Sequence, residues 1–91
     1  MKIKVLFTLF PSSSNDRFIY SGFRTDWKIN FNNYNCGRLL FDKQQIHPDK
    51  QTECIIEPLN PYLWKNVAIG NILECMEGVV LIGKAVVIEI M

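Results

Sequence analysis

The chain has 91 residues, which is enough for one small domain that buries a hydrophobic core without the help of disulfide bonds. Its apolar fraction of 48% and its charged fraction of 21% are ordinary for a folded soluble domain. The formal net charge of +1 argues against a nucleic-acid binder that depends on a strong basic excess.

The N-terminal residues MKIKVLFTLF place two lysines ahead of an apolar run, as a signal peptide does. The run is too short for a signal peptide, however, and no A-x-A cleavage site follows it. The apolar residues at positions 3, 5, 7 and 9 instead alternate with Lys2, Lys4 and Thr8. This period of two predicts a strand with one buried face. The following residues 11–16, PSSSND, have the composition of a loop.

The clearest alternation in the chain runs from residue 22 to residue 31. Apolar residues and Thr25 occupy the odd positions there, whereas Gly22, charged residues and Asn30 occupy the even ones. We expect a strand over 22–31 with Trp27 in the core. Residues 32–37, NNYNCG, predict a turn, because Asn and Gly tolerate positive φ.

Two short strands are expected next, over 37–42 (GRLLFD) and 52–59 (TECIIEPL), with a polar segment between them in which Pro48 and Asp49 favour a turn. Pro58 and Pro61 end the second strand, because proline cannot donate to a ladder of hydrogen bonds. The connection that follows, NPYLWKNVAIG, has room for one helical turn.

The tail CMEGVVLIGKAVVIEIM, residues 75–91, is the most apolar stretch of the chain. It is too short and too often interrupted for a membrane-spanning helix, and its β-branched residues and Gly83 disfavour any helix. We expect a hairpin with a strand over 71–76, a turn between Glu77 and Val80, and a final strand that is apolar on both faces. Such a strand is central in a sheet, or a partner covers its outer face. Gly83 fits a bulge where the sheet curves closed.

The chain therefore shows about six short strands, with turn signals roughly every ten residues and no convincing helix. This pattern predicts one all-β domain over residues 1–91, either a closed antiparallel barrel or a compact sandwich.

Three stretches match known family motifs. The tail CMEGVVLIGKAVV corresponds to an I-R-E-G-G-R-T-V-G-A-G-V-V motif, GFRTDWKINF to an N/G-Y-R-P-Q-F-Y-F strand, and IHPDKQTECIIEPLNP to an M-P-G-D…L-x-x-P stretch. By these motifs, residues 21–91 resemble the third, C-terminal β-barrel domain of bacterial elongation factor Tu. The resemblance implies a six-stranded closed antiparallel barrel of the translation elongation factor C-terminal domain type.

The resemblance also implies a contact with transfer RNA, which that barrel helps to grip. No G-x-x-x-x-G-K-[ST] phosphate loop is present, so the chain is not a GTPase. Where the family's hairpin carries arginine, glycine, arginine and threonine, this chain has Met76, Val79, Val80 and Leu81. Phosphate contacts need Lys or Arg, so the apolar hairpin favours contact with a protein.

The chain carries three cysteines, Cys36, Cys54 and Cys75, and no two of them have CxxC spacing. This is neither a disulfide framework nor a zinc signature, so we expect reduced thiols in a reducing cytoplasm and neither metal nor cofactor. His47, the only histidine, precedes Pro48 in an expected turn, with no nucleophile or carboxylate arranged beside it. We therefore expect a protein that is not an enzyme.

The sequence favours a protein-binding module, such as an immunity or inhibitor protein that caps a toxin, or a homodimer, with no role for a membrane. The candidate contact residues are Tyr62, Trp64, Val79, Val80 and Leu81. The alternative is a translation-related domain that binds transfer RNA through Arg17, Arg24, Arg38 and Lys84.

Two points stay open at the level of sequence. Tyr62 and Trp64 either close one end of the barrel or anchor a partner. The loop around Trp64 either covers the apolar hairpin or leaves it exposed.

Overall fold

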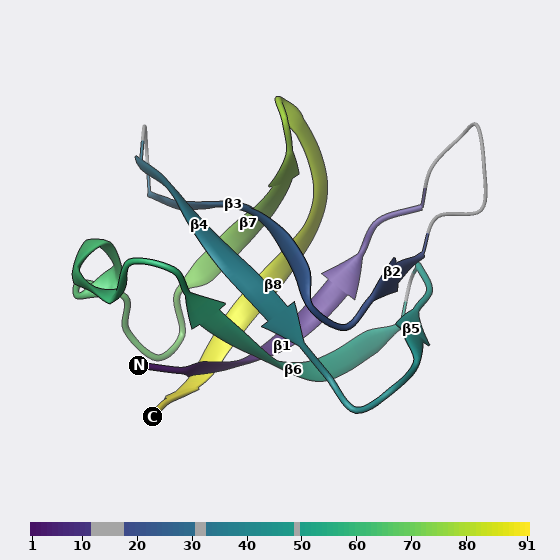
Figure 1. Ribbon diagram of the computed structural model, residues 1–91, viewed down its shortest axis with the longest axis horizontal. Helices are drawn as coiled ribbons and strands as arrows, with labels where there is room; N and C mark the ends of the chain where they lie inside the picture. The colour runs from purple at the N-terminus through teal and green to yellow at the C-terminus, as the bar shows by residue number, and fades with distance from the viewer. Residues whose placement is uncertain (12–17, 31–32, 49) are drawn as a thin grey trace.

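The computed structural model describes residues 1–11, 18–30, 33–48 and 50–91 (Figure 1). Five sequence predictions fall wholly or partly outside these residues: the loop over 11–16, the end of a strand at Phe31, the start of a turn at Asn32, the turn at Asp49, and the contact residue Arg17.

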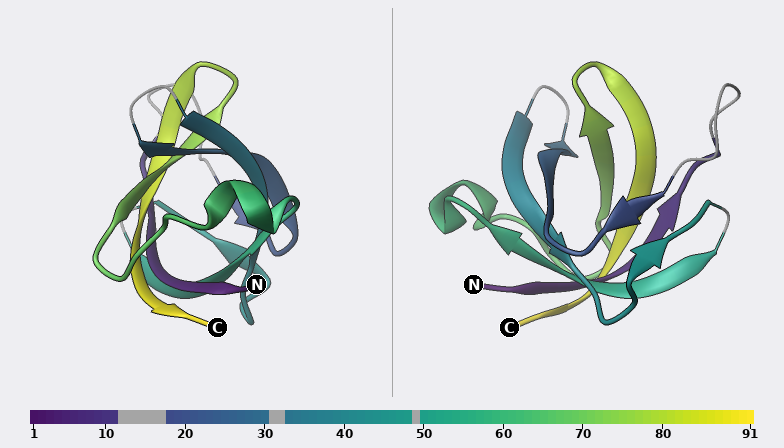
Figure 2. Two further views of the ribbon diagram at one scale, coloured as in Figure 1. Left: turned by 90° about the vertical axis from the view of Figure 1, so that its left-hand side faces the viewer. Right: turned by 45° about the vertical axis from the view of Figure 1, so that its right-hand side comes forward.

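Six strands of the described chain close into a barrel in the order β1–β6–β4–β3–β7–β8, with β8 returning to β1 (Figure 2). All of these pairings are antiparallel. The predicted all-β, closed, six-stranded antiparallel barrel is therefore confirmed. The barrel strands are β1 (Ile3–Leu9), β3 (Phe23–Asn30), β4 (Asn33–Leu40), β6 (Gln51–Pro58), β7 (Ile72–Glu77) and β8 (Val80–Ile90).

Three elements of the described residues, two short strands and one 3-10 turn, lie outside the barrel wall. The short strands β2 (Ile19–Tyr20) and β5 (Gln45–Ile46) pair with each other as a separate small sheet. They were not predicted, because two residues are too few to show a period of two. A single 3-10 turn, η1 (Pro61–Trp64), follows β6 where the sequence left room for one helical turn. No helix in the described residues has the length and apolar content to cross a membrane.

The prediction of a turn over 32–37 is wrong for residues 33–37, which form the first half of β4. Pairing with β3 overrides the turn preference of Asn and Gly here. Asn35 is buried, and its Nδ2 donates to Asn33 Oδ1 at 2.9 Å and to the Leu63 carbonyl at 3.4 Å. Gly37 has a packing role, because a Cβ there would lie 3.1 Å from the Trp64 ring.

The barrel interior holds the inward-facing side chain of every second residue of the strands, as the alternation of β1 predicts. Trp27 is fully buried, which confirms its predicted place in the core. Its indole Nε1 donates to the Gly37 carbonyl at 3.1 Å, and its ring packs edge-on against Phe7 with 5.9 Å between centroids. The hydrogen bond satisfies the one polar atom of a large buried side chain.

β8 carries two bulges along its length. Cys75 pairs with Gly83 and Met76 with Leu81, so Ile82 is an extra residue opposite β7. A second irregularity opposite β1 makes Ile88 extra in the same way. The first bulge adjoins Gly83, as expected for a sheet that curves closed.

Candidate protein-binding surface at the hairpin between β7 and β8

The turn between β7 and β8 is tight and apolar. Glu77 pairs with Val80, which leaves Gly78 and Val79 as the two central residues of the turn. Gly78 has a φ of +62°, a conformation that glycine adopts without steric cost and that two-residue hairpin turns favour at this position. Val79 takes a place that is more often filled by a polar residue.

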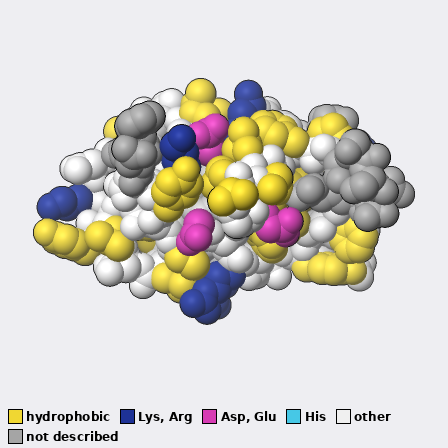
Figure 3. Space-filling model, turned by 90° about the horizontal axis from the view of Figure 1, so that it is seen from above, with side chains coloured by type: hydrophobic (Ala, Val, Ile, Leu, Met, Phe, Trp, Pro, Cys, Tyr) yellow, Lys and Arg dark blue, Asp and Glu magenta, His cyan; other side chains and the backbone are white. Residues whose placement is uncertain are grey.

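Three successive apolar side chains are exposed at this turn. Val79 is 95% exposed, Val80 53% and Leu81 41%, whereas the next residue, Ile82, is buried. The bulge explains the change, because it sends Ile82 into the barrel and leaves Leu81 opposite Met76 on the outside. Seen from above, a group of apolar side chains occupies the middle of this face, with acidic and basic side chains around it (Figure 3). We call Val79, Val80 and Leu81 the hairpin apex.

The loop around Trp64 does not cover the hairpin apex. η1 lies beside the ends of β4 and β6, away from the tip of the hairpin (Figures 1 and 2). Trp64 itself is fully buried, so its proposed role as an interface anchor is corrected: its ring closes one end of the barrel. Tyr62 is 69% exposed, with Lys65 Nζ 4.5 Å from its ring centroid. The five predicted contact residues therefore split into the hairpin apex, an exposed tyrosine elsewhere and a core tryptophan.

An aromatic ledge, formed by two residues that the sequence reasoning did not place among the contact residues, lies next to the hairpin. The rings of Phe18 and Tyr20 meet edge-to-face with 5.3 Å between centroids, and both are substantially exposed. Together with Phe23, Glu77 and Ile82 they line a pocket of about 380 Å³. The alternation of Phe18 and Tyr20 with buried Ile19 was the available signal. A partner protein that contacts this face would therefore meet a pocket beside Phe18 and Tyr20 and, next to it, the projecting hairpin apex.

The candidate basic residues do not form one continuous track in the described structure. Arg24 of β3 and Arg38 of β4 lie directly opposite each other, and Arg38 also lies opposite Glu57 of β6. Lys84 lies on β8, opposite Glu74 of β7. The structure therefore brings Arg24 and Arg38 together, whereas β7 separates Lys84 from them.

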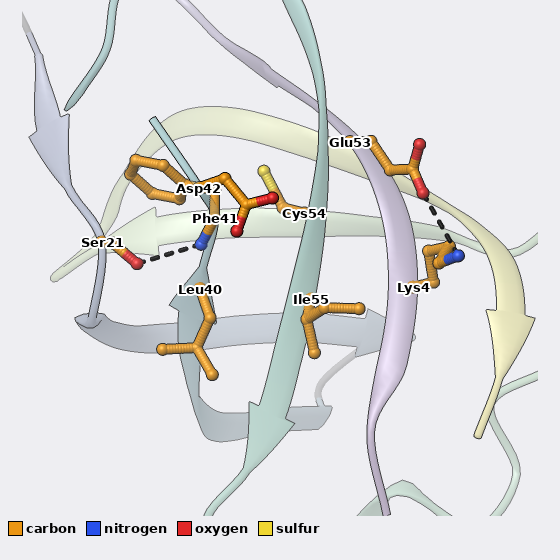
Figure 4. Close-up of a pocket in the computed structure, with 8 residues that line it drawn as sticks. All are labelled: Lys4, Ser21, Leu40, Phe41, Asp42, Glu53, Cys54 and Ile55. Carbon is orange, nitrogen blue, oxygen red and sulfur yellow. Dashed lines mark hydrogen bonds and ion pairs between the residues drawn. The ribbon is translucent and has the colours of Figure 1, made fainter. Parts of the chain in front are cut away.

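A second pocket, of about 460 Å³, lies against the outer side of β6 (Figure 4). Lys4 forms ion pairs there with Glu53 at 3.3 Å and with Glu89 at 3.4 Å, and hydrogen bonding to Glu53 is the main reason that its pKa is raised. Burial raises the pKa of the Cys54 thiol to about 12. This thiol is protonated at neutral pH, and a protonated thiol is a poor nucleophile.

Thiol labelling is a direct test of this environment. Cys36 is half-buried, whereas Cys54 and Cys75 are buried. At about pH 8, Ellman's reagent is expected to modify Cys36 first and the other two only after denaturation, because the reagent attacks an accessible thiolate. Cys36→Ser should abolish the fast phase and leave the total under denaturing conditions lower by one thiol. A fast phase that persists in this variant would contradict the burial of Cys54 and Cys75.

The fold places this chain among small closed β-barrel domains. No protein-family model matches the sequence, and no curated protein matches it.

Proposed function

We propose that this protein is a cytoplasmic, non-enzymatic binding module that contacts a partner protein through the hairpin apex. The observation that carries the proposal is the exposure of three successive apolar side chains at a turn, where a polar residue would cost the fold nothing. Residues that break a local sequence rule without a benefit to the fold mark functional positions. Exposed apolar groups of this kind are typical of protein-binding sites.

The energetics favour a partner that encloses the apex. Full burial of a valine or leucine side chain contributes about 1.5–3 kcal/mol, so covering these three partly exposed side chains contributes about 3 kcal/mol. The apex lies on a hairpin whose strands are both paired within the barrel. A pre-ordered projection loses little conformational entropy on binding.

This shape suits an inhibitor that caps a concave site on another protein. We propose that the protein is an immunity protein that blocks a toxin. In the complex, the hairpin apex enters the concave site of the toxin, and the pocket beside Phe18 and Tyr20 receives a side chain from the toxin. Aromatic side chains next to an apolar projection are typical contact residues of such interfaces.

Affinity capture from the source organism tests the proposal. Leu81→Lys and Val79→Glu are each expected to weaken the captured complex at least about tenfold, because each puts a charge into a desolvated contact. Leu63→Lys is the matched control: Leu63 has a similar exposure of 46% but lies on η1. All three variants should melt within a few degrees of the unmodified protein, because the changed side chains are exposed. If both hairpin variants keep every captured protein, the apex is not the binding site.

Transfer RNA is the alternative partner, favoured by the facing pair Arg24 and Arg38. Like charges directly opposite each other destabilise a sheet, and an anionic ligand would relieve that cost. A complex with transfer RNA would weaken steeply between about 0.05 M and 0.2 M salt, through counterion release, and would be lost with Arg24→Ala. A complex through the apex would keep its affinity over that range and in that variant.

A further inference from the structure

The outer surface of β8 carries a second apolar region, separate from the hairpin apex. β8 lies between β1 and β7 in the barrel (Figure 1). Val86 faces outward and lies opposite Ile72 of β7 on one side and Leu6 of β1 on the other. Ile72 is 57% exposed, and Ile88, further along β8, is also exposed. We call Leu6, Ile72, Val86 and Ile88 the β8 stripe.

Charges of opposite sign lie at the two ends of this stripe. Lys84 precedes Val86 on the outside of β8, and Glu89 follows Ile88. Both side chains are exposed. Glu89 forms an ion pair with Lys4 at 3.4 Å, whereas Lys84 makes no ion pair with any of the described residues. The sequence of the strand thus reads cation, apolar pair, anion along one face.

We propose that the β8 stripe is the interface of a homodimer in which two copies pack face to face. The two-fold axis lies in the interface and crosses the strands at Val86, so the two β8 strands run in opposite directions. Val86 then meets Val86 of the second copy, and Lys84 of each copy faces Glu89 of the other. Two identical ion pairs form, as the symmetry of a two-fold interface requires.

The charges select this arrangement over the other face-to-face packing. A two-fold axis along β8 would place Lys84 against Lys84 and Glu89 against Glu89, and like charges across an interface are strongly unfavourable. The reversed arrangement brings Lys84 of each copy to Glu89 of the other, and Glu89 then lies between Lys4 of its own chain and Lys84 of the second copy. It also leaves both hairpin apices outside the contact, so the dimer does not depend on the function proposed above.

The small area of the β8 stripe limits the affinity of the dimer. Stable interfaces bury about 800 Å² per partner, which is more than these few partly exposed side chains provide. We therefore expect a reversible dimer with a dissociation constant on the order of 100 μM. Sedimentation equilibrium from about 10 μM to about 1 mM spans the transition.

The test combines one apolar change with a charge exchange. Val86→Lys places two ammonium groups on the two-fold axis and is expected to weaken the dimer at least about tenfold. Lys84→Glu and Glu89→Lys should each weaken it about fivefold at low salt, and the double variant should recover most of the loss. Lys50→Glu, the same change of charge outside the stripe, should have no effect.

Three results would overturn the proposal. One is an unmodified protein that stays monomeric at about 1 mM, ten times the expected dissociation constant. A second is a double variant that dimerises no better than either single variant, with all variants shown by thermal melting to be folded. The third is dimerisation that is lost with Leu81→Lys and kept with Val86→Lys, which would place the contact at the hairpin apex instead.

Discussion

Replacement of Trp64 by alanine is expected to lower the free energy of unfolding by about 4 kcal/mol, the range found for large aromatic side chains removed from cores. The Trp64 ring is fully buried and packs against Gly37, where an added Cβ would lie 3.1 Å from it. A domain of this size has a stability of about 5–10 kcal/mol, so the variant would lose about 40–80% of it. Urea unfolding followed by circular dichroism measures the loss.

Phenylalanine variants of the two tryptophans provide the control. Trp27 Nε1 donates to the Gly37 carbonyl, whereas Trp64 Nε1 is buried with no acceptor among the described residues. Trp27→Phe removes a buried hydrogen bond, whereas Trp64→Phe removes a buried polar atom that has no partner, so Trp27→Phe should cost about 1–2 kcal/mol more than Trp64→Phe. If the free energy of unfolding of Trp64→Ala lies within about 1 kcal/mol of that of the unmodified protein, Trp64 does not close the barrel.

Replacement of Gly83 by alanine is expected to cost about 3 kcal/mol, at the upper end of the range for overpacked cores. A Cβ at this position would lie 2.7 Å from the Thr8 carbonyl oxygen and 3.0 Å from the Phe7 ring. The Thr8 oxygen belongs to the backbone of the neighbouring strand, so relief requires β1 and β8 to separate. Urea unfolding should show a lower midpoint, and amide hydrogen exchange should increase along β1 and β8.

Gly22→Ala separates steric overlap from backbone strain. Gly22 has a φ of +93° but has open space around it, so alanine there meets only the conformational cost of about 1 kcal/mol. Gly83 has no positive φ, so an alanine there is disfavoured by the overlap of its Cβ with the neighbouring strand and not by backbone strain. Equal losses in the two variants would contradict the close approach of β8 to β1.

The sequence by itself determined the strands that have one buried face. The alternation in β1 and β3 placed Phe7 and Trp27 in the core, and the spacing of six strands with turns between them indicated either a closed barrel or a compact sandwich. The apolar tail was also recognisable as a hairpin with a bend near Gly83. These features depend on a period of two within one segment, and such a period is visible without knowledge of the neighbouring strands.

Only the tertiary structure decided the rest. Residues 33–37 have the composition of a turn, yet pairing with β3 and packing against Trp64 make them a strand. The tail is apolar on both faces, so its sequence could not tell which side chains point outward. The bulge at Ile82 settles that choice and exposes Leu81. Intrinsic strand preferences span about 1 kcal/mol per residue and depend on context, so contacts between distant segments outweigh them here.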